Sequence, residues 1–272
     1  MQNFKNTEDM LKQYGTASNL NSRISLHQAY STNKLGWANW VFEQYQFRPN
    51  QRILELGCGN GGIWHSHAGE MPDGVQLTLS DFSQAMLDAA KANTDAHGFI
   101  SYRVIDAQSI PFDDDTFDVV IANHMLYHVP DIDKALSEIA RVLKPTGTLY
   151  ATTIGSGNFK EIIKLLHAFD PRIDFAQDAI TEAFGLESGS SMLRKVFKSV
   201  GKVHYEDSLH ITEPQPLVDY ILSSQGIGNI NEIISGDNIA RFADYVETIC
   251  AKQGYIDVAK DAGMFTAVQP IL

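Results

Sequence analysis

A glycine-rich turn directly after a short apolar stretch is the part of the sequence best suited to hold a cofactor. The stretch 52–56, RILEL, is typical of a buried strand. The glycines that follow it are Gly57, Gly59, Gly61 and Gly62. Glycine accepts a positive φ and lets a ligand approach the backbone, and a helix start near Trp64 adds free N–H groups. We therefore expect this turn, with Cys58 inside it, to hold the polar part of a nucleotide-like cofactor.

The spacing of these glycines fits two classes of cofactor. Gly57, Gly59 and Gly62 satisfy G-x-G-x-x-G, the dinucleotide fingerprint. With Glu55 and Gly61 the same stretch reads E-x-G-x-G-x-G, which resembles motif I of class I S-adenosylmethionine-dependent methyltransferases. A carboxylate would repel an anionic pyrophosphate, whereas S-adenosylmethionine carries a cationic ammonium and a sulfonium. Glu55 therefore favours S-adenosylmethionine, although a turn that only closes a strand–helix unit is still an alternative.

Asp81 is the second candidate residue, because it follows an alternating stretch, 75–79, that predicts a strand. An acid at the end of the second strand of such a unit is placed to accept hydrogen bonds from both ribose hydroxyls. This holds for dinucleotide and methyltransferase folds alike. The alternative is that Asp81 is merely solvated and that Ser83 caps a helix over 84–92.

Motifs also stand at the ends of the next predicted strands. They are Asp106-Ala107 after the strand 100–105, the turn P-F-x-D-x-x-F-D at 111–118, Asn123 after the strand 119–122, and K-P-T-G at 144–147 before the strand 148–153. Together they resemble the small-molecule branch of the methyltransferases that includes the ubiquinone and menaquinone biosynthesis enzymes. The resemblance covers residues 51–153, and Thr146 departs from it, because the family usually has glycine there.

The resemblance implies a role for each candidate. In a parallel α/β sheet, ligands lie beyond the carboxyl ends of the strands. The glycine turn would hold the methionine part of S-adenosylmethionine, and Asp81 the ribose. The other implied contacts are Phe82 and Met86 at the adenine face, Asp106 and the Ala107 N–H at the adenine edge, and Asn123 beside the sulfonium. The product would be S-adenosylhomocysteine.

His124 and His128 are the candidate catalytic residues. Transfer from a sulfonium needs nucleophile, methyl and sulfur in line, so no catalytic dyad is required. If the acceptor is a hydroxyl or an acidic carbon, a general base helps, and these histidines are nearest to the expected methyl. Either could instead bond only the backbone of its loop. His65 and His67 point apart on a helix, so their spacing predicts no metal site.

These elements predict one α/β domain over residues 1–272: a Rossmann-like, seven-stranded, mostly parallel sheet with strand 7 antiparallel, helices on both faces and a helical cap. We expect an N-terminal helical lid over 1–50, the cofactor-binding core over 51–155, and a C-terminal half over 156–272. Helices are predicted at 21–30, 35–45, 132–143, 159–168, 178–184, 191–197, 217–222 and 239–251, and strands six and seven at 202–208 and 264–269. The segments 1–50, 156–190 and 210–262 would control acceptor entry.

Composition limits the partners that the chain can have. The 272 residues are 44% hydrophobic and carry a formal net charge of -12. That charge argues against nucleic acid and against stable membrane association, and favours a small-molecule acceptor. Two cysteines, Cys58 and Cys250, and a polar N-terminus predict a reducing cytoplasm. The acceptor and the oligomeric state are not predicted. Two alternatives are a nicotinamide-dependent oxidoreductase that uses the same glycine turn and a protein of this fold that binds the cofactor without methyl transfer.

Overall fold

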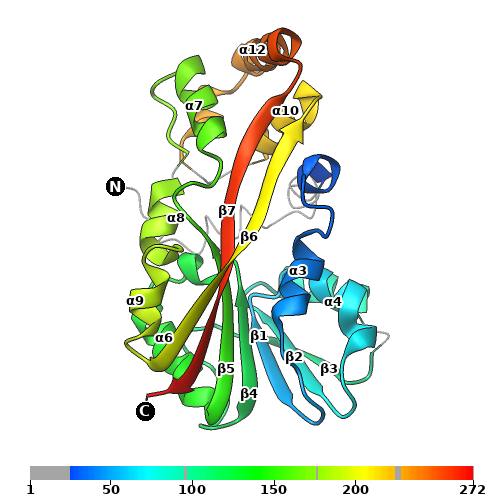
Figure 1. Cartoon of the computed structure of the whole chain (residues 1–272), viewed down its shortest axis with the longest axis vertical. Coiled ribbons are helices and arrows are strands. Elements are labelled where there is room, and N and C mark those ends of the chain that lie inside the picture. Colours follow the sequence, from blue (N-terminus) through cyan, green and yellow to red (C-terminus); the bar gives the residue numbers. More distant parts are fainter. Residues whose placement is uncertain (1–24, 95–96, 176, 224–227, 272) are drawn as a thin grey trace. The chain divides into compact units, whose positions relative to one another are not determined.

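Seven strands form a sheet in the order β3-β2-β1-β4-β5-β7-β6 (Figure 1). They are β1 (Arg52–Leu56), β2 (Gln76–Asp81), β3 (Ile100–Val104), β4 (Phe117–Asn123), β5 (Leu143–Ile154), β6 (Phe197–Ile211) and β7 (Ile256–Pro270). The first five strands pair in parallel, and β7 runs antiparallel to β5. This confirms the expected seven-stranded, mostly parallel sheet with an antiparallel seventh strand.

The computed structural model describes residues 25–94, 97–175, 177–223 and 228–271. Its helices are α3 (Trp37–Gln44), α4 (Gly62–His67), α5 (Gln84–Thr94), α6 (Ile132–Val142), α7 (Lys160–Phe169), α8 (Gln177–Phe184), α9 (Gly189–Leu193), α10 (Pro214–Leu222), α11 (Ile230–Ile233) and α12 (Asp237–Gln253). Short 3₁₀ turns lie at Ala68–Glu70 and Leu126–His128. Of the helix predicted over 21–30, residues 25–30 are helical, and 21–24 lie outside the described residues. No helix in the described ranges is both long and apolar enough to span a membrane.

The chain divides into two compact units. We call the first the core unit; it comprises Trp37–Gly155, Ile180–Tyr205 and Ala262–Leu272. We call the second the helical unit; it comprises Met1–Gly36, Ser156–Ala179 and Glu206–Asp261. Each unit has a hydrophobic core of its own.

Alternation along the strands sorts the side chains of the core unit into two layers. On β1, Ile53 packs in one layer and Leu54 in the other, and Val119 and Val120 do the same on β4. The layer of Ile53 contains side chains of α3 and α4, whereas the layer of Leu54 contains α6, and Figure 1 shows these helices beside the sheet. Helices therefore cover both faces of the central strands, as the sequence predicts.

Helix α6 shows how local sequence and packing agree. The Asp131 carboxylate accepts a hydrogen bond from the Lys134 N–H and caps the first turn. Leu136 and Ile139 are buried against the sheet. Leu143, which the sequence placed on the same apolar face, instead begins β5 and pairs with Phe117. That part of the prediction was wrong because a buried leucine suits a strand as well as a helix.

The last two strands are much longer than the sequence predicted. The ranges 202–208 and 264–269 lie within β6 and β7, which extend to 15 residues each. The added strand residues of β6 include many exposed polar side chains, which give no apolar alternation to detect. The helix predicted over 191–197 was wrong in its bounds, because α9 ends at Leu193 and Phe197 begins β6.

The helical unit is built around a second hydrophobic core. Side chains of α7, α10, α11 and α12 pack there with Leu26, with Leu209 of β6 and with Val258 of β7. A buried ion pair joins Asp207 and Lys260, whose side chains are 0% and 8% exposed. This unit therefore contains its own apolar core and a buried charge pair.

Candidate functional site

The turn after β1 takes a left-handed backbone at three glycines. The φ angles of Gly57, Gly59 and Gly61 are 66°, 56° and 70°. A Cβ atom on Gly57 would lie 2.8 Å from Cβ of Met125, and one on Gly61 would lie 3.2 Å from Cβ of Ala90. A Cβ atom on Gly59 would meet nothing within 4 Å. Two of the glycines are therefore needed for close packing, while Gly59 marks the open side of the turn, where a ligand can approach the backbone.

Asp81 ends β2 beside this turn. Its Oδ2 accepts a hydrogen bond of 3.0 Å from the Gly59 N–H, and its Oδ1 accepts one of 2.9 Å from the Ser83 N–H. Burial raises the pKa of Asp81, and the N–H groups of Ser83 and Gly59 oppose part of that rise. A carboxylate offers about four lone-pair positions. Asp81 therefore keeps acceptor capacity for hydroxyl groups of a ligand in the open part of the turn.

Phe82 and Met86 follow Asp81 along the chain. Phe82 is 44% exposed, which is unusual for a large apolar side chain in this fold, whereas Met86 is buried on α5. An exposed aromatic side chain next to an acid suits a flat apolar ring. The exposure of Phe82 therefore fits the expected adenine contact, and the contact expected of Met86 stays a prediction.

The loop after β3 holds Asp106 and Ala107. The Asp106 carboxylate accepts hydrogen bonds from the backbone N–H and the side-chain amide of Gln108, at 2.9 and 3.0 Å. Ala107 is buried. The Ile105 N–H donates to the carbonyl oxygen of Asp81 at 3.1 Å, which ties the end of β3 to the end of β2. The two acids thus stand on adjacent strand ends, as the sequence predicts.

Glu55 lies behind the glycine turn and is only 2% exposed. Asn123 donates from its Nδ2 to one carboxylate oxygen at 2.9 Å, and the Trp64 indole N–H donates to the other. The same Asn123 amide donates to the hydroxyl of Tyr45 at 2.8 Å. Glu55 and Asn123, predicted separately, are therefore joined in one buried network with two aromatic residues.

Burial also changes the acidity of this carboxyl group. It raises the pKa of Glu55 to about 7, although the hydrogen bonds from Trp64 and Asn123 lower it in part. Burial likewise raises the pKa of the Tyr45 phenol, and the nearby Glu55 carboxylate adds to the rise. Protonation of Glu55 therefore changes near neutral pH, unlike that of an exposed glutamate.

Tyr45 and Trp64 were not among the residues predicted for the site. Tyr45 belongs to the apolar stripe of the helix predicted over 35–45, which indicates packing, and it follows α3 directly in the structure. Trp64 was taken only as the start of a helix that in fact begins at Gly62. Both carry a polar atom that needs a partner when buried. That property was the available signal, but the spacing along the chain does not identify Glu55 as the partner.

His124 and His128 lie in the loop after β4. His124 has a φ of 49°, and its N–H donates to the carbonyl and the hydroxyl oxygen of Thr152, at 3.1 and 3.0 Å. Its ring centroid is 4.8 Å from that of Trp37. The ring of His128 lies 4.5 Å from that of Tyr127. Both histidines are half-buried among aromatic rings, and a role as general base stays a prediction.

Cys58 and the two histidines of α4 bind neighbours in the protein. Burial raises the pKa of the Cys58 thiol well above its ordinary value, so it is protonated at neutral pH. His65 contacts the carbonyl oxygen of Asn93, and His67 contacts Glu70. Within the described ranges, no three His, Cys, Asp or Glu side chains lie close enough to hold a metal ion.

Part of the chain is similar to proteins of a known family. Residues 54–151 match the family model described as a methyltransferase domain. The ubiquinone/menaquinone biosynthesis C-methyltransferase UbiE of Vibrio parahaemolyticus is 31% identical over 136 residues, which cover 49% of this chain and 52% of that protein. The chain therefore spans about half the length of the Vibrio relatives that it matches.

Solved structures share the fold over the whole chain. One is Haemonchus contortus phosphoethanolamine N-methyltransferase 2 in complex with S-adenosyl-L-methionine, with a TM-score of 0.59 and 19% identity, covering 100% of this chain and 61% of that chain. Another is the [4+2]-cyclase SpnF, with a TM-score of 0.58 and 20% identity, covering 100% and 98%. At these identities the likeness shows a common fold.

Proposed function

We propose that this chain, which carries a class I S-adenosylmethionine-dependent methyltransferase core over residues 54–151, transfers a methyl group to a small-molecule acceptor. The observation that carries the proposal is the open side of the glycine turn at Gly59, next to the carboxylate of Asp81 and the exposed ring of Phe82. An open glycine turn, an acid and an aromatic face suit the amino acid, ribose and adenine of this cofactor.

The residues around the turn would bind and orient S-adenosylmethionine, which supplies an electrophilic methyl group on its sulfonium. The turn 57–61 would hold the methionine part, Asp81 the ribose, and Phe82 with Asp106 the adenine. The family match and the UbiE relatives, whose name describes C-methyltransferases, support this assignment. Because the cofactor brings the reactivity, the main task of the protein is alignment and exclusion of water.

Glu55 would act from behind the turn. Its carboxyl group holds the Trp64 indole and the Asn123 amide, so it orients the start of α4 and the end of β4 together. A negative charge at this position also favours a cationic cofactor over a pyrophosphate. We therefore propose that the hydrogen-bonded pair of Glu55 and Asn123 holds the residues that contact the methionine part and the sulfonium.

Acceptor selection is proposed to lie in the segments 1–50, 156–190 and 210–262, which are additions to the family core. The family match ends at residue 151, and additions to a shared scaffold are where specificity usually resides. His124 and His128 follow β4 directly and would face the acceptor. The organisation of the chain as one domain with a helical cap belongs to the same proposal.

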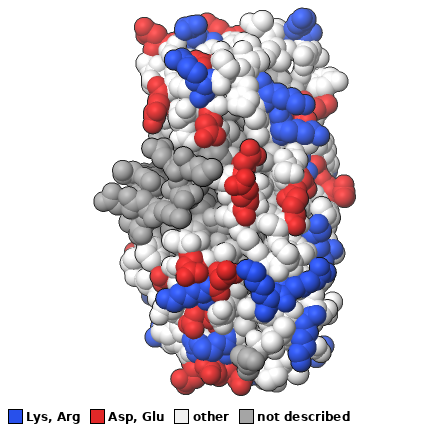
Figure 2. Space-filling model, turned by 90° about the vertical axis from the view of Figure 1, so that its left-hand side faces the viewer, with Lys and Arg blue, Asp and Glu red and all other residues white. Residues whose placement is uncertain are grey.

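We further propose a small-molecule acceptor without nucleic-acid binding or stable membrane association. The formal charge of -12 supports this, and on the face in Figure 2 acidic and basic side chains are interspersed. A cytoplasmic location is proposed because Cys58 and Cys250 are both unpaired and a thiol inside the glycine turn needs a reducing environment.

Calorimetry of the full chain against S-adenosylmethionine, S-adenosylhomocysteine and NAD tests the cofactor. We expect the first two to bind and NAD to give no heat, and the reverse result would make the protein a dinucleotide enzyme. Transfer of labelled methyl groups into metabolite extracts then tests the activity. Cofactor binding without any labelled product would indicate a protein that uses the fold for another purpose, as the cyclase SpnF shows this fold can.

A further inference from the structure

The polar face of β2 and β3 is not explained by the proposed function. Leu77 and Leu79 of β2 are buried in the layer that includes Trp64, whereas Gln76 and Thr78 point to the opposite face. The chain passes from β3 to β4 through residues 105–116 without a helix. This half of the sheet is therefore covered by helices on one face only.

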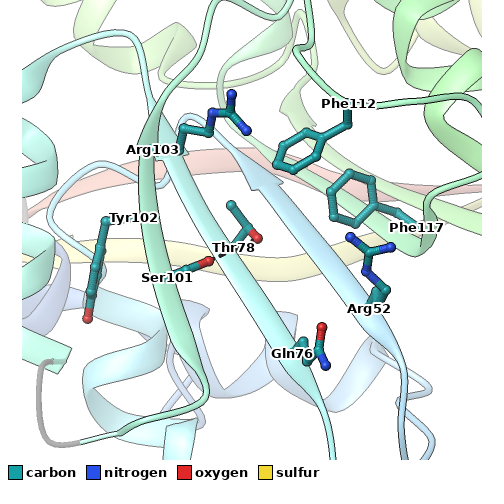
Figure 3. Close-up of a pocket in the computed structure, with 8 residues that line it drawn as sticks. All are labelled: Arg52, Gln76, Thr78, Ser101, Tyr102, Arg103, Phe112 and Phe117. Carbon is teal, nitrogen blue, oxygen red and sulfur yellow. Dashed lines mark hydrogen bonds between the residues drawn. The ribbon is translucent and has the colours of Figure 1, made fainter.

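A pocket of about 360 Å³ lies on this uncovered face (Figure 3). Its floor includes Thr78 and Ser101, whose hydroxyl groups are 3.1 Å apart, and its edge is formed by Phe112 of the turn before β4 and by Phe117, the first residue of β4. The pocket extends along the strands from Arg52, which begins β1, to Arg103, which pairs with Ser80 near the end of β2. None of its lining residues is one of those proposed to bind the cofactor.

Two arginines stand over the aromatic edge of the pocket. The guanidinium carbon of Arg103 is 4.8 Å from the centroid of Phe112, and that of Arg52 is 5.5 Å from the centroid of Phe117. The two phenylalanine rings meet edge to face at 4.8 Å, and Figure 3 shows the guanidinium groups at either end of the ring pair. An aromatic face holds a guanidinium in position and leaves its N–H edge free to donate.

The described residues form no ion pair with either guanidinium group: none of the ion pairs among them includes Arg52 or Arg103. The carboxylate of Asp118, on β4, is bound at 2.7 Å by Lys144 and at 2.9 Å by the backbone N–H of Arg52. In a chain with a formal charge of -12, two uncompensated cations in one hollow mark a local preference for an anion.

We propose that this pocket is a second binding site, for a small molecule that carries a phosphate or carboxylate group on a flat apolar part. Arg103 binds the anionic group through paired N–H donors, since guanidinium geometry matches both phosphate and carboxylate. Arg52, at the other end of the ring pair, adds positive charge to the pocket. The hydroxyl groups of Thr78 and Ser101 line the floor, and Phe112 contacts the flat part. The site is independent of methyl transfer and lies on the opposite side of the sheet from the layer of α4.

Calorimetry of the full chain, saturated with S-adenosylhomocysteine, tests this site with phenyl phosphate, benzoate and inorganic phosphate as probes. We expect phenyl phosphate or benzoate to bind. The probe with the lower Kd shows whether the site prefers a phosphate or a carboxylate group. Inorganic phosphate binds more weakly, because it lacks the flat part. Arg103→Gln weakens binding at least about tenfold, since it removes hydrogen bonds to a charged group. Arg52→Gln removes only a nearby positive charge and weakens binding less.

Arg194→Gln is the matched control. Arg194 is exposed on the segment after α9, and its replacement by glutamine changes the net charge by the same amount. It leaves the affinity unchanged. The thermal midpoint of each variant and the Arg Nε–Hε resonances of the native protein provide independent readouts. Absence of saturable binding overturns the proposal, as does equal weakening by all three variants or shifts confined to resonances other than those of Arg52 and Arg103.

Discussion

At the scale of single residues, the chemistry of the site depends on where each acid is buried. Asp81 stands at the open side of the glycine turn and bonds the Gly59 N–H, whereas Glu55 lies behind it with both oxygens bonded. The two carboxylates come from adjacent strands and have different surroundings. In the proposed function, Asp81 contacts the ligand and Glu55 supports the residues that do.

Glu55 should make stability depend on pH. Its pKa is raised from 4.5 to about 7, so the native state keeps a proton that the unfolded chain releases in that range. The free energy of unfolding should therefore fall by about 3 kcal/mol as the pH rises from 4.5 to 7, and stay lower above that. Urea unfolding at a series of pH values measures this.

Glu55→Gln should remove this part of the pH dependence, because the amide does not titrate. Glu43→Gln, an exposed position on α3, serves as the control and should keep the native slope. If the slope between these pH values is the same in native protein and Glu55→Gln, the carboxyl group is not the one that titrates.

Asp81→Ala should weaken S-adenosylmethionine binding by at least tenfold and leave the fold intact. A charged acceptor of ribose hydroxyls is lost at the surface, and hydrogen bonds to a charged group contribute roughly 1.5 to 3 kcal/mol each. Calorimetry measures the affinity and circular dichroism the fold. Asp73→Ala, at an exposed position before β2, should bind like the native protein. Unchanged affinity in Asp81→Ala would remove this residue from the site.

His124→Gln distinguishes base catalysis from alignment. We expect the change mainly to raise the acceptor KM, because a general base typically contributes about 10² to 10⁴-fold and alignment alone can supply more. Turnover in native and variant protein across pH 5 to 9, with the acceptor found in the metabolite screen, gives the answer. A loss of at least roughly a hundredfold in kcat, with disappearance of a limb near the ordinary histidine pKa, would instead make His124 the base.

At the scale of elements, the strand–turn–helix unit of β1 and α4 works because its glycines have different neighbours. Gly57 packs on Met125 from the loop after β4, and Gly61 packs on α5. Gly59 faces open space with a similar φ. One element therefore combines two packing positions with one position for ligand approach.

Gly57→Ala and Gly59→Ala should separate these roles. Both add left-handed strain of roughly 1 to 2 kcal/mol, and Gly57→Ala adds about 1 to 3 kcal/mol more because its Cβ overlaps Met125. Gly59→Ala should unfold at a higher urea concentration than Gly57→Ala, yet bind S-adenosylmethionine more weakly than the native protein. Equal stabilities for the two variants, or native affinity in Gly59→Ala, would contradict this division.

At the scale of the whole molecule, two separate cores stabilise the chain. The core unit holds the layers on both faces of β1 and β4, and the helical unit is held by its own apolar cluster. In the helical unit, Asp207 is also bonded by the hydroxyl of Ser31 and the backbone N–H of Asn33, at 2.7 and 2.9 Å. This buried carboxylate therefore joins β6 to the segment before α3.

Asp207→Ala should destabilise the helical unit in particular. Removing one partner of a buried ion pair costs roughly 3 to 5 kcal/mol. Amide exchange should accelerate in α10 and α12 and change little in β1 and β4. Asp257→Ala, which removes the exposed partner of His210 in the same unit, should have little effect. Uniform acceleration in both units would show that they unfold together.

Local patterns in the sequence were sufficient for the core strands and for the glycine turn at which we propose the ligand site. Alternation and glycine spacing identify β1, β2 and the turn between β1 and α4, because those properties belong to neighbouring residues. Asp81, Asp106 and Asn123 follow from the rule that parallel strands end at one edge. The bounds of β6, β7 and α9 could not be predicted, since pairing with a distant strand extends a segment without any apolar pattern of its own.

By itself, then, the sequence determined the order of strand, glycine turn and acid, and with it the class of cofactor, because each depends on residues close together in the chain. Only the tertiary structure decided which side chains from distant parts of the chain form hydrogen bonds with one another. The network of Glu55, Trp64, Asn123 and Tyr45 and the raised pKa of Glu55 require burial by four separate segments. The contacts of Arg52 with Phe117 and of Arg103 with Phe112 likewise depend on how distant segments fold together. The spacing of these residues in the sequence does not predict them.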